Sequence, residues 1–157
     1  MLLRLTGRAF GLVLLLLIGL SVLSACGGGT PGITNAVMAK DVSGDAKDPV
    51  GITTDFPADQ AVFHTVVTVT NLPTGSKVKT VWTAVDVGSA AAPNTKITET
   101  ELAVEGSRNV DFTLTPNSGA FPPGKFKADI HLNDKLDRTV EFTVGGGSAA
   151  PSPPSGS

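Results

Sequence analysis

The most reactive side chain in this sequence belongs to its only cysteine, Cys26. A thiolate is a strong nucleophile, and a cysteine thiol can carry a lipid group as a thioether. The three residues before it, Leu23, Ser24 and Ala25, are apolar or small, which leaves the backbone accessible to processing enzymes. This order of residues predicts a lipidation site at Cys26.

The segment before these four residues has the order of an export signal. Two positive charges, Arg4 and Arg8, precede an apolar run over residues 10–20, and small residues follow it. This is the arrangement of a bacterial lipoprotein signal peptide, and Leu23 to Cys26 read as its lipobox. We therefore expect residues 1–25 to be removed and Cys26 to hold the mature chain on a membrane, because several acyl chains anchor a protein firmly.

Two other interpretations of the N-terminal segment stay open. An uncleaved transmembrane helix needs about 20 apolar residues, whereas the run over residues 10–25 is shorter and contains Gly11, Gly19 and Ser21. A secreted protein with an unmodified thiol would carry one unpaired cysteine into an oxidising compartment.

The mature chain would be short and mildly acidic. Cleavage leaves 132 residues, enough for one domain, and removes two of the 12 basic side chains, so 10 remain against 14 acidic ones. This balance argues against nucleic acid as a partner, which needs a basic patch. Without a second cysteine no intrachain disulfide can form, so the fold must depend on burial.

Composition indicates the domain limits. Residues 26–32 comprise the lipidated cysteine and a Gly-rich stretch, and residues 145–157 contain only Gly, Ser, Ala and Pro. Such segments cannot build a core, so we expect a flexible tether, a domain at residues 33–144, and a disordered tail. A linker to a further domain and a stalk through cell-wall polymer are the alternatives for the tail.

Apolar side chains alternate with polar ones through the predicted domain, as in Val110, Phe112 and Leu114. Threonine and valine dominate these runs and favour strands. Strands are expected at residues 33–40, 61–71, 77–88, 97–105, 108–115, 125–132 and 137–144. About seven antiparallel strands, each with one apolar face, bury it by stacking as two sheets, so the predicted fold class is an all-β sandwich. Pro123 and Gly124 suit the central positions of a type II turn.

The core pattern resembles that of small bacterial lipoproteins with a single immunoglobulin-like domain. The resemblance covers residues 33–144 and rests on Phe56, Val62-Phe63, Val81-Trp82, Pro123-Gly124-Lys125-Phe126 and Val140-Glu141-Phe142. It implies an immunoglobulin-like sandwich with a buried tryptophan in the third long strand. The inter-sheet cysteine pair of such domains is absent, and Phe126 stands where a tyrosine is frequent.

The predicted core consists of Phe63, Trp82, Phe112, Phe126, Ile130 and Phe142. For Trp82 the opposite phase stays open, because Val81, Val85 and Val87 form a competing apolar set on the same strand. An exposed Trp82 would favour a ligand-binding sheet face.

The sequence contains no recognisable catalytic motif. His64 and His131 fall at outward positions of predicted strands and are interpreted as surface histidines. Glu99 and Glu101 share one strand face, where charge on an edge strand protects against aggregation. We expect no enzymatic activity and no cofactor.

The most polar part of the predicted domain is residues 41–59. Asp41, Asp45 and Asp48 could supply oxygen ligands to Ca²⁺, but their spacing is not that of an EF-hand loop and Lys47 lies among them. A solvated loop is therefore predicted, and a Ca²⁺-binding or other ligand-binding module remains the alternative function.

These features together predict a non-catalytic, lipid-anchored interaction or structural module on the extracytoplasmic face of the cell envelope. We expect a monomer that binds another envelope protein, whose identity the sequence does not give.

The lipidation site is tested by substituting Cys26→Ser. Radiolabelled palmitate should be incorporated by the wild type and not by the variant, which should accumulate as precursor because cleavage follows lipidation. Equal labelling of the two proteins would contradict the assignment of Cys26.

Overall fold

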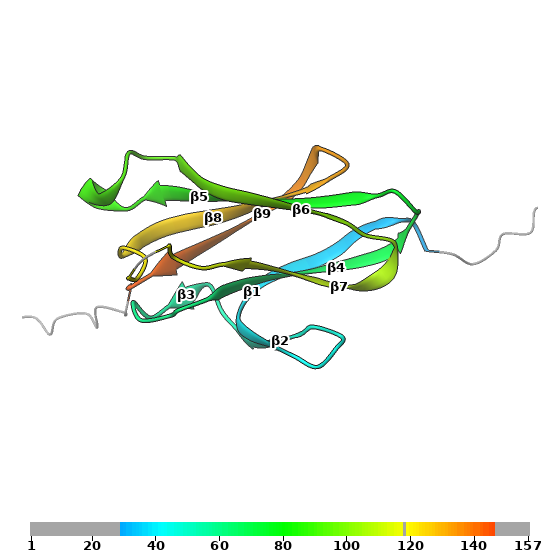
Figure 1. The fold of residues 1–157 in the computed structure, drawn as a ribbon, viewed down its shortest axis with the longest axis horizontal. Coiled ribbons are helices and arrows are strands. Elements are labelled where there is room, and N and C mark those ends of the chain that lie inside the picture. The colour runs from blue at the N-terminus through cyan, green and yellow to red at the C-terminus, as the bar shows by residue number, and fades with distance from the viewer. Residues whose placement is uncertain (1–28, 118, 147–157) are drawn as a thin grey trace, which may run out of the picture.

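The computed structural model describes residues 29–117 and 119–146. Residues 1–28, with Cys26 and the predicted signal peptide, and most of the predicted tail lie outside the described residues. Nine strands and one 3₁₀ turn, Gly88–Ala90, make up the fold (Figure 1). The strands are β1 (Gly32–Ser43), β2 (Asp48–Ile52), β3 (Asp55–Phe56), β4 (Phe63–Leu72), β5 (Lys77–Asp86), β6 (Thr95–Ala103), β7 (Gly106–Leu114), β8 (Gly124–Leu132) and β9 (Lys135–Val144). No helix in the described ranges has the length and apolar character needed to cross a membrane.

The strands form two facing sheets. One has the order β2-β1-β4-β7 and the other β3-β9-β8-β5-β6. In immunoglobulin terms, β1, β4 and β7 take positions A, B and E, while β5, β8 and β9 take positions C, F and G. The prediction of an all-β, immunoglobulin-like sandwich is confirmed. In the described ranges no strand occupies position D, and the five-stranded sheet instead adds β6 beside β5.

The structure corrects the prediction of a loop at residues 41–59. This segment holds the end of β1, the whole of β2 and the two-residue β3, so the fold has two strands more than the seven expected. β2 contains Pro49 and Gly51, which weaken a strand signal but are tolerated at a sheet edge. β3 pairs in parallel with β9, a contact between distant segments that local sequence does not encode.

Gly124 serves a different purpose from the predicted type II turn. Its φ is 155°, whereas the third residue of such a turn has φ near 80°. A Cβ at this position would clash with the carbonyl oxygen of Asp86. Glycine is therefore required for the close approach of β8 to the end of β5.

The core is built around aromatic rings. Phe142 on β9 contacts Phe126, with ring centroids 5.4 Å apart and nearly parallel planes, and meets Phe63 of the opposite sheet at 5.6 Å. Phe56 and Trp82 approach the same ring edge-on at 5.8 and 6.0 Å. All six predicted core side chains are at most 2% exposed: Phe63, Trp82, Phe112, Phe126, Ile130 and Phe142. Trp82 faces inward, while Val81 and Val85 lie half-buried on the outer face.

The central position of Phe142 gives a stability test. Phe142→Ala should destabilise the domain by about 3–5 kcal/mol, because it removes contacts with four rings and leaves a cavity. Leu136→Ala is a control on the same strand; Leu136 is 52% exposed, so we expect a change within about 0.5 kcal/mol. Urea unfolding followed by Trp82 fluorescence measures both, and equal losses would contradict the described core.

Candidate functional site

Two of the three predicted calcium ligands accept hydrogen bonds from other residues. Asp41 lies in β1 and accepts a hydrogen bond from the backbone N–H of Val42. Asp48 lies in β2 and accepts one from Asn109 Nδ2 of β7 at 3.2 Å. Asp45 is exposed in the turn between the two strands. In residues 29–117 and 119–146, no three His, Cys, Asp or Glu side chains converge in a way that could hold a metal ion.

His64 faces outward, as the sequence indicates, but it is a paired and largely buried side chain. It lies on the outer face of β4, and its Nδ1 is 3.0 and 3.1 Å from the two carboxylate oxygens of Asp111 on β7. The two side chains are only 12% and 13% exposed. A shallow hollow of about 420 Å³ lies beside His64 and is also lined by Lys40, Asp59 and Gln60.

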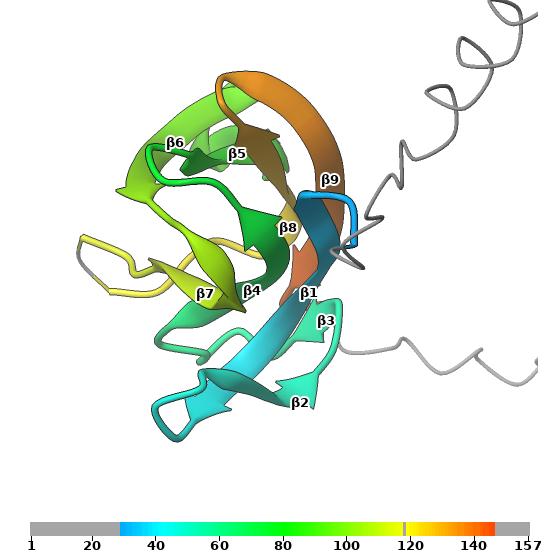
Figure 2. The same cartoon turned by 90° about the vertical axis from the view of Figure 1, so that its right-hand side faces the viewer.

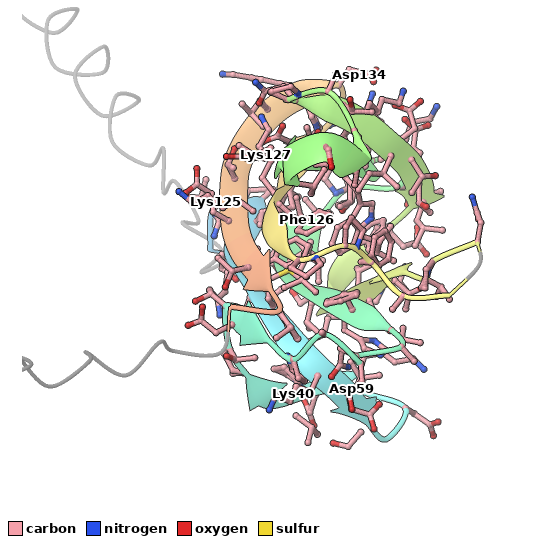
Figure 3. The ribbon with its side chains drawn as sticks, turned by 90° about the vertical axis from the view of Figure 1, so that its left-hand side faces the viewer. Lys40, Asp59, Lys125, Phe126, Lys127 and Asp134 are labelled. Carbon is pink, nitrogen blue, oxygen red and sulfur yellow. The ribbon has the colours of Figure 1, made fainter. Side chains whose placement is uncertain are left out.

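This pair lacks the third component of a nucleophilic site. Among the described residues, no hydroxyl lies within hydrogen-bond distance of His64, so the imidazole has no nucleophile to activate. Lys40 and Asp59 lie near the molecule's end where β1 turns into β2 (Figure 3). The arrangement therefore stabilises the outer face of the four-stranded sheet.

The outer face of the five-stranded sheet carries charges of both signs. Lys125 and Lys127 precede and follow the inward-facing Phe126 on β8, and both project from the outer face (Figure 3). Lys127 pairs with Asp129 at 2.8 Å. Burial opposes the ionisation of Asp129, but hydrogen bonds from Lys127 and Thr139 outweigh it and lower the pKa of this carboxyl.

Glu99 and Glu101 lie on this outer face of β6, which is an edge strand as predicted. A hydrogen bond from Lys96 lowers the pKa of Glu99, and the hydrogen bond to Glu101 raises the pKa of Lys77. His131 also lies on this face, half-buried, and its Nδ1 has no partner among the described residues. These are solvent-facing ion pairs, which contribute little stability each and do not form a catalytic group.

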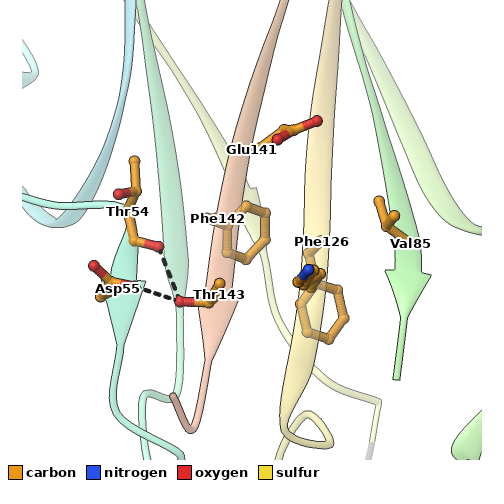
Figure 4. A pocket seen from close by; sticks show the side chains of 8 residues that line it. Thr54, Asp55, Val85, Phe126, Glu141, Phe142 and Thr143 are labelled. Atoms are coloured by element: carbon orange, nitrogen blue, oxygen red, sulfur yellow. Dashed lines mark hydrogen bonds between the residues drawn. The ribbon is translucent and has the colours of Figure 1, made fainter. Parts of the chain in front are cut away.

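A second hollow, of about 510 Å³, lies beside β3, β9 and β8 (Figure 4). Its polar groups bond to one another: the Thr143 hydroxyl donates to the Asp55 carboxylate, and the carbonyl oxygen of Thr54 is 3.5 Å away. Glu141 lies at its upper margin and Val85 on its far side. These contacts fasten β3 to β9, and no histidine lies among the residues that line the hollow to activate the Thr54 or Thr143 hydroxyl.

The most open side of the sandwich lies between β6 and β7 (Figure 2). β6 pairs only with β5, and β7 only with β4, so each presents an unpaired edge. The inward-facing side chains of β6 are Thr98, Thr100 and Leu102, opposite Trp82, Thr80 and Val78 of β5. All three are exposed, Leu102 by 39%, because no strand of the other sheet covers them.

A groove of about 320 Å³ follows this open side and carries no charge. It is lined by Ile97, Thr98, Thr100, Thr113, Leu114, Thr115, Asn117 and Phe121. Beside it on β5, the buried Thr80 Oγ1 and Trp82 Nε1 have no hydrogen-bond partner among the described residues. We call this feature the β6–β7 groove.

Several important side chains were not identified from the sequence. Phe121 packs against Phe63 and Phe126 although it lies in the loop before β8. Asp111 alternates with the inward-facing Val110 and Phe112, and its pairing with His64 depends on the β4–β7 register. Neither residue belongs to a motif, so only a model of strand pairing could have found them.

No family model matches the chain, and no curated protein matches it. Among solved structures, it is similar to an immunoglobulin-like protein from Pseudomonas aeruginosa, with 13% identity, a TM-score of 0.49, and coverage of 74% of this chain and 98% of that one. It is also similar to a β-glucosidase from Listeria innocua (15% identity, TM-score 0.44) and a β-D-glucoside glucohydrolase from Trichoderma reesei (12%, TM-score 0.39). The chain covers 16% and 19% of those two enzymes.

The arrangement of Asp41, Asp45 and Asp48 predicts no response to calcium. Thermal unfolding in 1 mM Ca²⁺ and in chelator should give the same midpoint, because the carboxylates do not converge. A site with a Kd of about 10 μM would instead stabilise the domain by roughly 2.7 kcal/mol under that condition. Such a rise, abolished by Asp45→Asn and retained in Asp86→Asn, would contradict this description.

Proposed function

We propose that this chain is a lipid-anchored, non-catalytic interaction module of the bacterial cell envelope, and that it binds an extended segment of another envelope protein along the β6–β7 groove. The observation that carries the proposal is the uncovered inner face of β6 beside two unpaired strand edges.

The location follows from the sequence around Cys26. Lipidation there would place the domain outside the cytoplasm on the surface of a membrane, with the acyl chains as its anchor. The mildly acidic mature chain agrees with this arrangement, because attachment through a covalent lipid needs no basic surface.

The absence of catalysis is inferred from the polar side chains of the described residues. Among residues 29–117 and 119–146, no hydroxyl lies within hydrogen-bond distance of the histidine–carboxylate pair of His64 and Asp111. The hydroxyl of Thr143, in the hollow beside β3, β9 and β8, donates to Asp55. Neither site offers an activated nucleophile or an acid–base pair facing a common space.

The β6–β7 groove favours a peptide strand as its occupant. Adding a strand at the edge of β7 would fill the vacant D position and supply main-chain hydrogen bonds. The same strand would cover Thr98, Thr100 and Leu102. Because the groove walls carry no charge, the inserted face of the partner should present small or apolar uncharged side chains.

Neighbouring charges argue against pairing between copies of this chain. Lys96, Glu99 and Glu101 project from the outer face of β6 beside its free edge. Such charges make edge-to-edge association of identical sheets unfavourable. A partner whose strand enters at β7 avoids them.

Site-specific photo-crosslinking in intact cells tests the proposal. A photoreactive side chain at Thr100, in the groove, should give one discrete adduct with another protein, whereas the same group at Thr139, on the outer face of β9, should give none. Adding Thr98→Glu should remove the adduct because it brings a charge into the uncharged groove, and Thr113→Ser, a control within the groove, should retain it.

Three results would count against this function. An adduct of twice the monomer mass would indicate self-association. Equal adducts from Thr100 and Thr139 would indicate contact without a defined surface. Persistence of the adduct in the Thr98→Glu variant would place the partner outside the groove.

A further inference from the structure

The chain is fastened to the domain very close to Cys26. Asn71, near the end of β4, donates a hydrogen bond from its Nδ2 to the carbonyl oxygen of Gly29 at 2.9 Å. Its backbone has φ of 50°, a left-handed conformation that asparagine tolerates better than most residues. Gly29 therefore belongs to the folded domain, although the Gly-rich composition of residues 26–32 predicts a flexible tether there.

The Asn71 side chain is itself held in place. The Ser107 hydroxyl of β7 accepts a hydrogen bond from the backbone N–H of Asn71 at 2.9 Å and donates to Asn71 Oδ1 at 3.3 Å. These contacts orient the amide so that its NH₂ group points to Gly29. We call Gly29, Asn71 and Ser107 the tether clamp.

The tether clamp leaves little chain between the domain and the lipidation site. Cys26 and Gly29 are three residues apart, and three residues of extended chain span at most about 10–11 Å. An unclamped tether, from Cys26 to the start of β1 at Gly32, could span about twice that distance.

The clamp lies at one end of the sandwich. The turns between β4 and β5, β6 and β7, and β8 and β9 meet at this end, and the described chain leaves at the opposite end after β9 (Figure 1). The three turns are joined, since the N–H of Val104 donates to the carbonyl of Ser76 and the N–H of Lys77 donates to Asn133 Oδ1, both at 2.9 Å. We call this the clamp end.

We propose that the tether clamp seats the clamp end directly on the lipid headgroup layer, so that the sandwich stands upright on the membrane. This inference rests on the proposed lipid anchor at Cys26. A span of about 10 Å is of the order of the headgroup region itself, since a bilayer of about 40–45 Å contains a hydrocarbon core of about 30 Å.

Charge at the clamp end suits this position. Lys77 pairs with Glu101 at 2.8 Å and Lys79 with Asp134 at 2.7 Å. Arg108 and Lys135, in the same region, form no ion pair with the described residues. Glu105, in the β6–β7 turn, also forms no ion pair with the described residues and accepts a hydrogen bond from the Thr74 hydroxyl at 2.8 Å. Of these seven charged side chains four are positive and three negative, whereas the mature chain is acidic overall.

The upright position determines which surfaces a partner can reach. Ten-residue strands such as β4 and β9 extend about 33 Å, so the opposite end would lie well above the membrane. The β6–β7 groove runs along the side of the sandwich, and Phe121 and Asn117 mark the part of it farthest from the clamp end. A partner strand would enter from that end.

Fluorescence quenching in vesicles tests the orientation. Because Cys26 is the only cysteine and would be acylated, an introduced thiol can be labelled selectively. The full-length lipidated protein would carry a fluorophore at Thr74→Cys, in the β4–β5 turn, or at Ala90→Cys, before β6 at the opposite end. Both positions are exposed. In phosphatidylcholine vesicles with spin-labelled headgroups, Thr74→Cys should be quenched several-fold more than Ala90→Cys.

The clamp is tested with Asn71→Asp. Aspartate retains the left-handed tolerance and the acceptor for Ser107 but cannot donate to Gly29, so quenching at position 74 should fall toward that at position 90. Asn35→Asp, at an exposed position of β1, adds the same charge without touching the clamp and should leave the quenching unchanged.

The outcomes separate the two proposals. Protein that does not float with vesicles would refute the lipid anchor, and the seated orientation with it. Protein that floats but shows equal quenching at positions 74 and 90 would overturn the orientation alone. Unequal quenching that Asn71→Asp leaves unaltered would overturn the role of the clamp.

Discussion

Contact between aromatic rings across the two sheets is the interaction on which the rest of this structure depends. No disulfide is available to join the sheets, because the chain has one cysteine. Instead Phe142 of β9 meets Phe63 of β4, while Phe126 stacks on its other side. Phe56 extends this group to β3. The rings therefore join the strands that an immunoglobulin domain would hold with its cysteine pair.

The position of the aromatic group explains why one side of the sandwich is open. Its rings come mainly from β4, β8 and β9, and Trp82 of β5 touches only its margin. Beyond Trp82 the inner face continues onto β6 as threonines and one leucine, and the opposite sheet ends at β7. Threonine hydroxyls tolerate solvent, so this side can remain uncovered in the isolated domain. The same feature supplies both the candidate binding surface and the unpartnered polar atoms of Thr80 and Trp82 beside it.

Local pattern is sufficient for seven of the nine strands and for the core, whereas non-local contacts are not predictable from it. Alternation placed Phe112, Ile130 and Phe142 on inner faces, and the structure buries all three. The β2 hairpin was missed because Pro49 and Gly51 obscure its strand character. The pairing of His64 with Asp111, and the bond from Asn71 to Gly29, join residues 47 and 42 positions apart. The first pair depends on the register of β4 against β7, and the second depends on which segments meet at one end of the sandwich. A single sequence specifies neither directly.

We propose that a lipid on Cys26 presents the domain on a membrane, a short distance from the clamp that holds Gly29. Intact-mass spectrometry of the protein extracted from cell envelopes tests this most directly. We expect a chain that begins at Cys26 and carries the added mass of acyl groups. Fragmentation of the N-terminal peptide should locate these groups on Cys26. A mass that retains residues 1–25, or a chain that begins after Cys26 and carries no lipid, would contradict it.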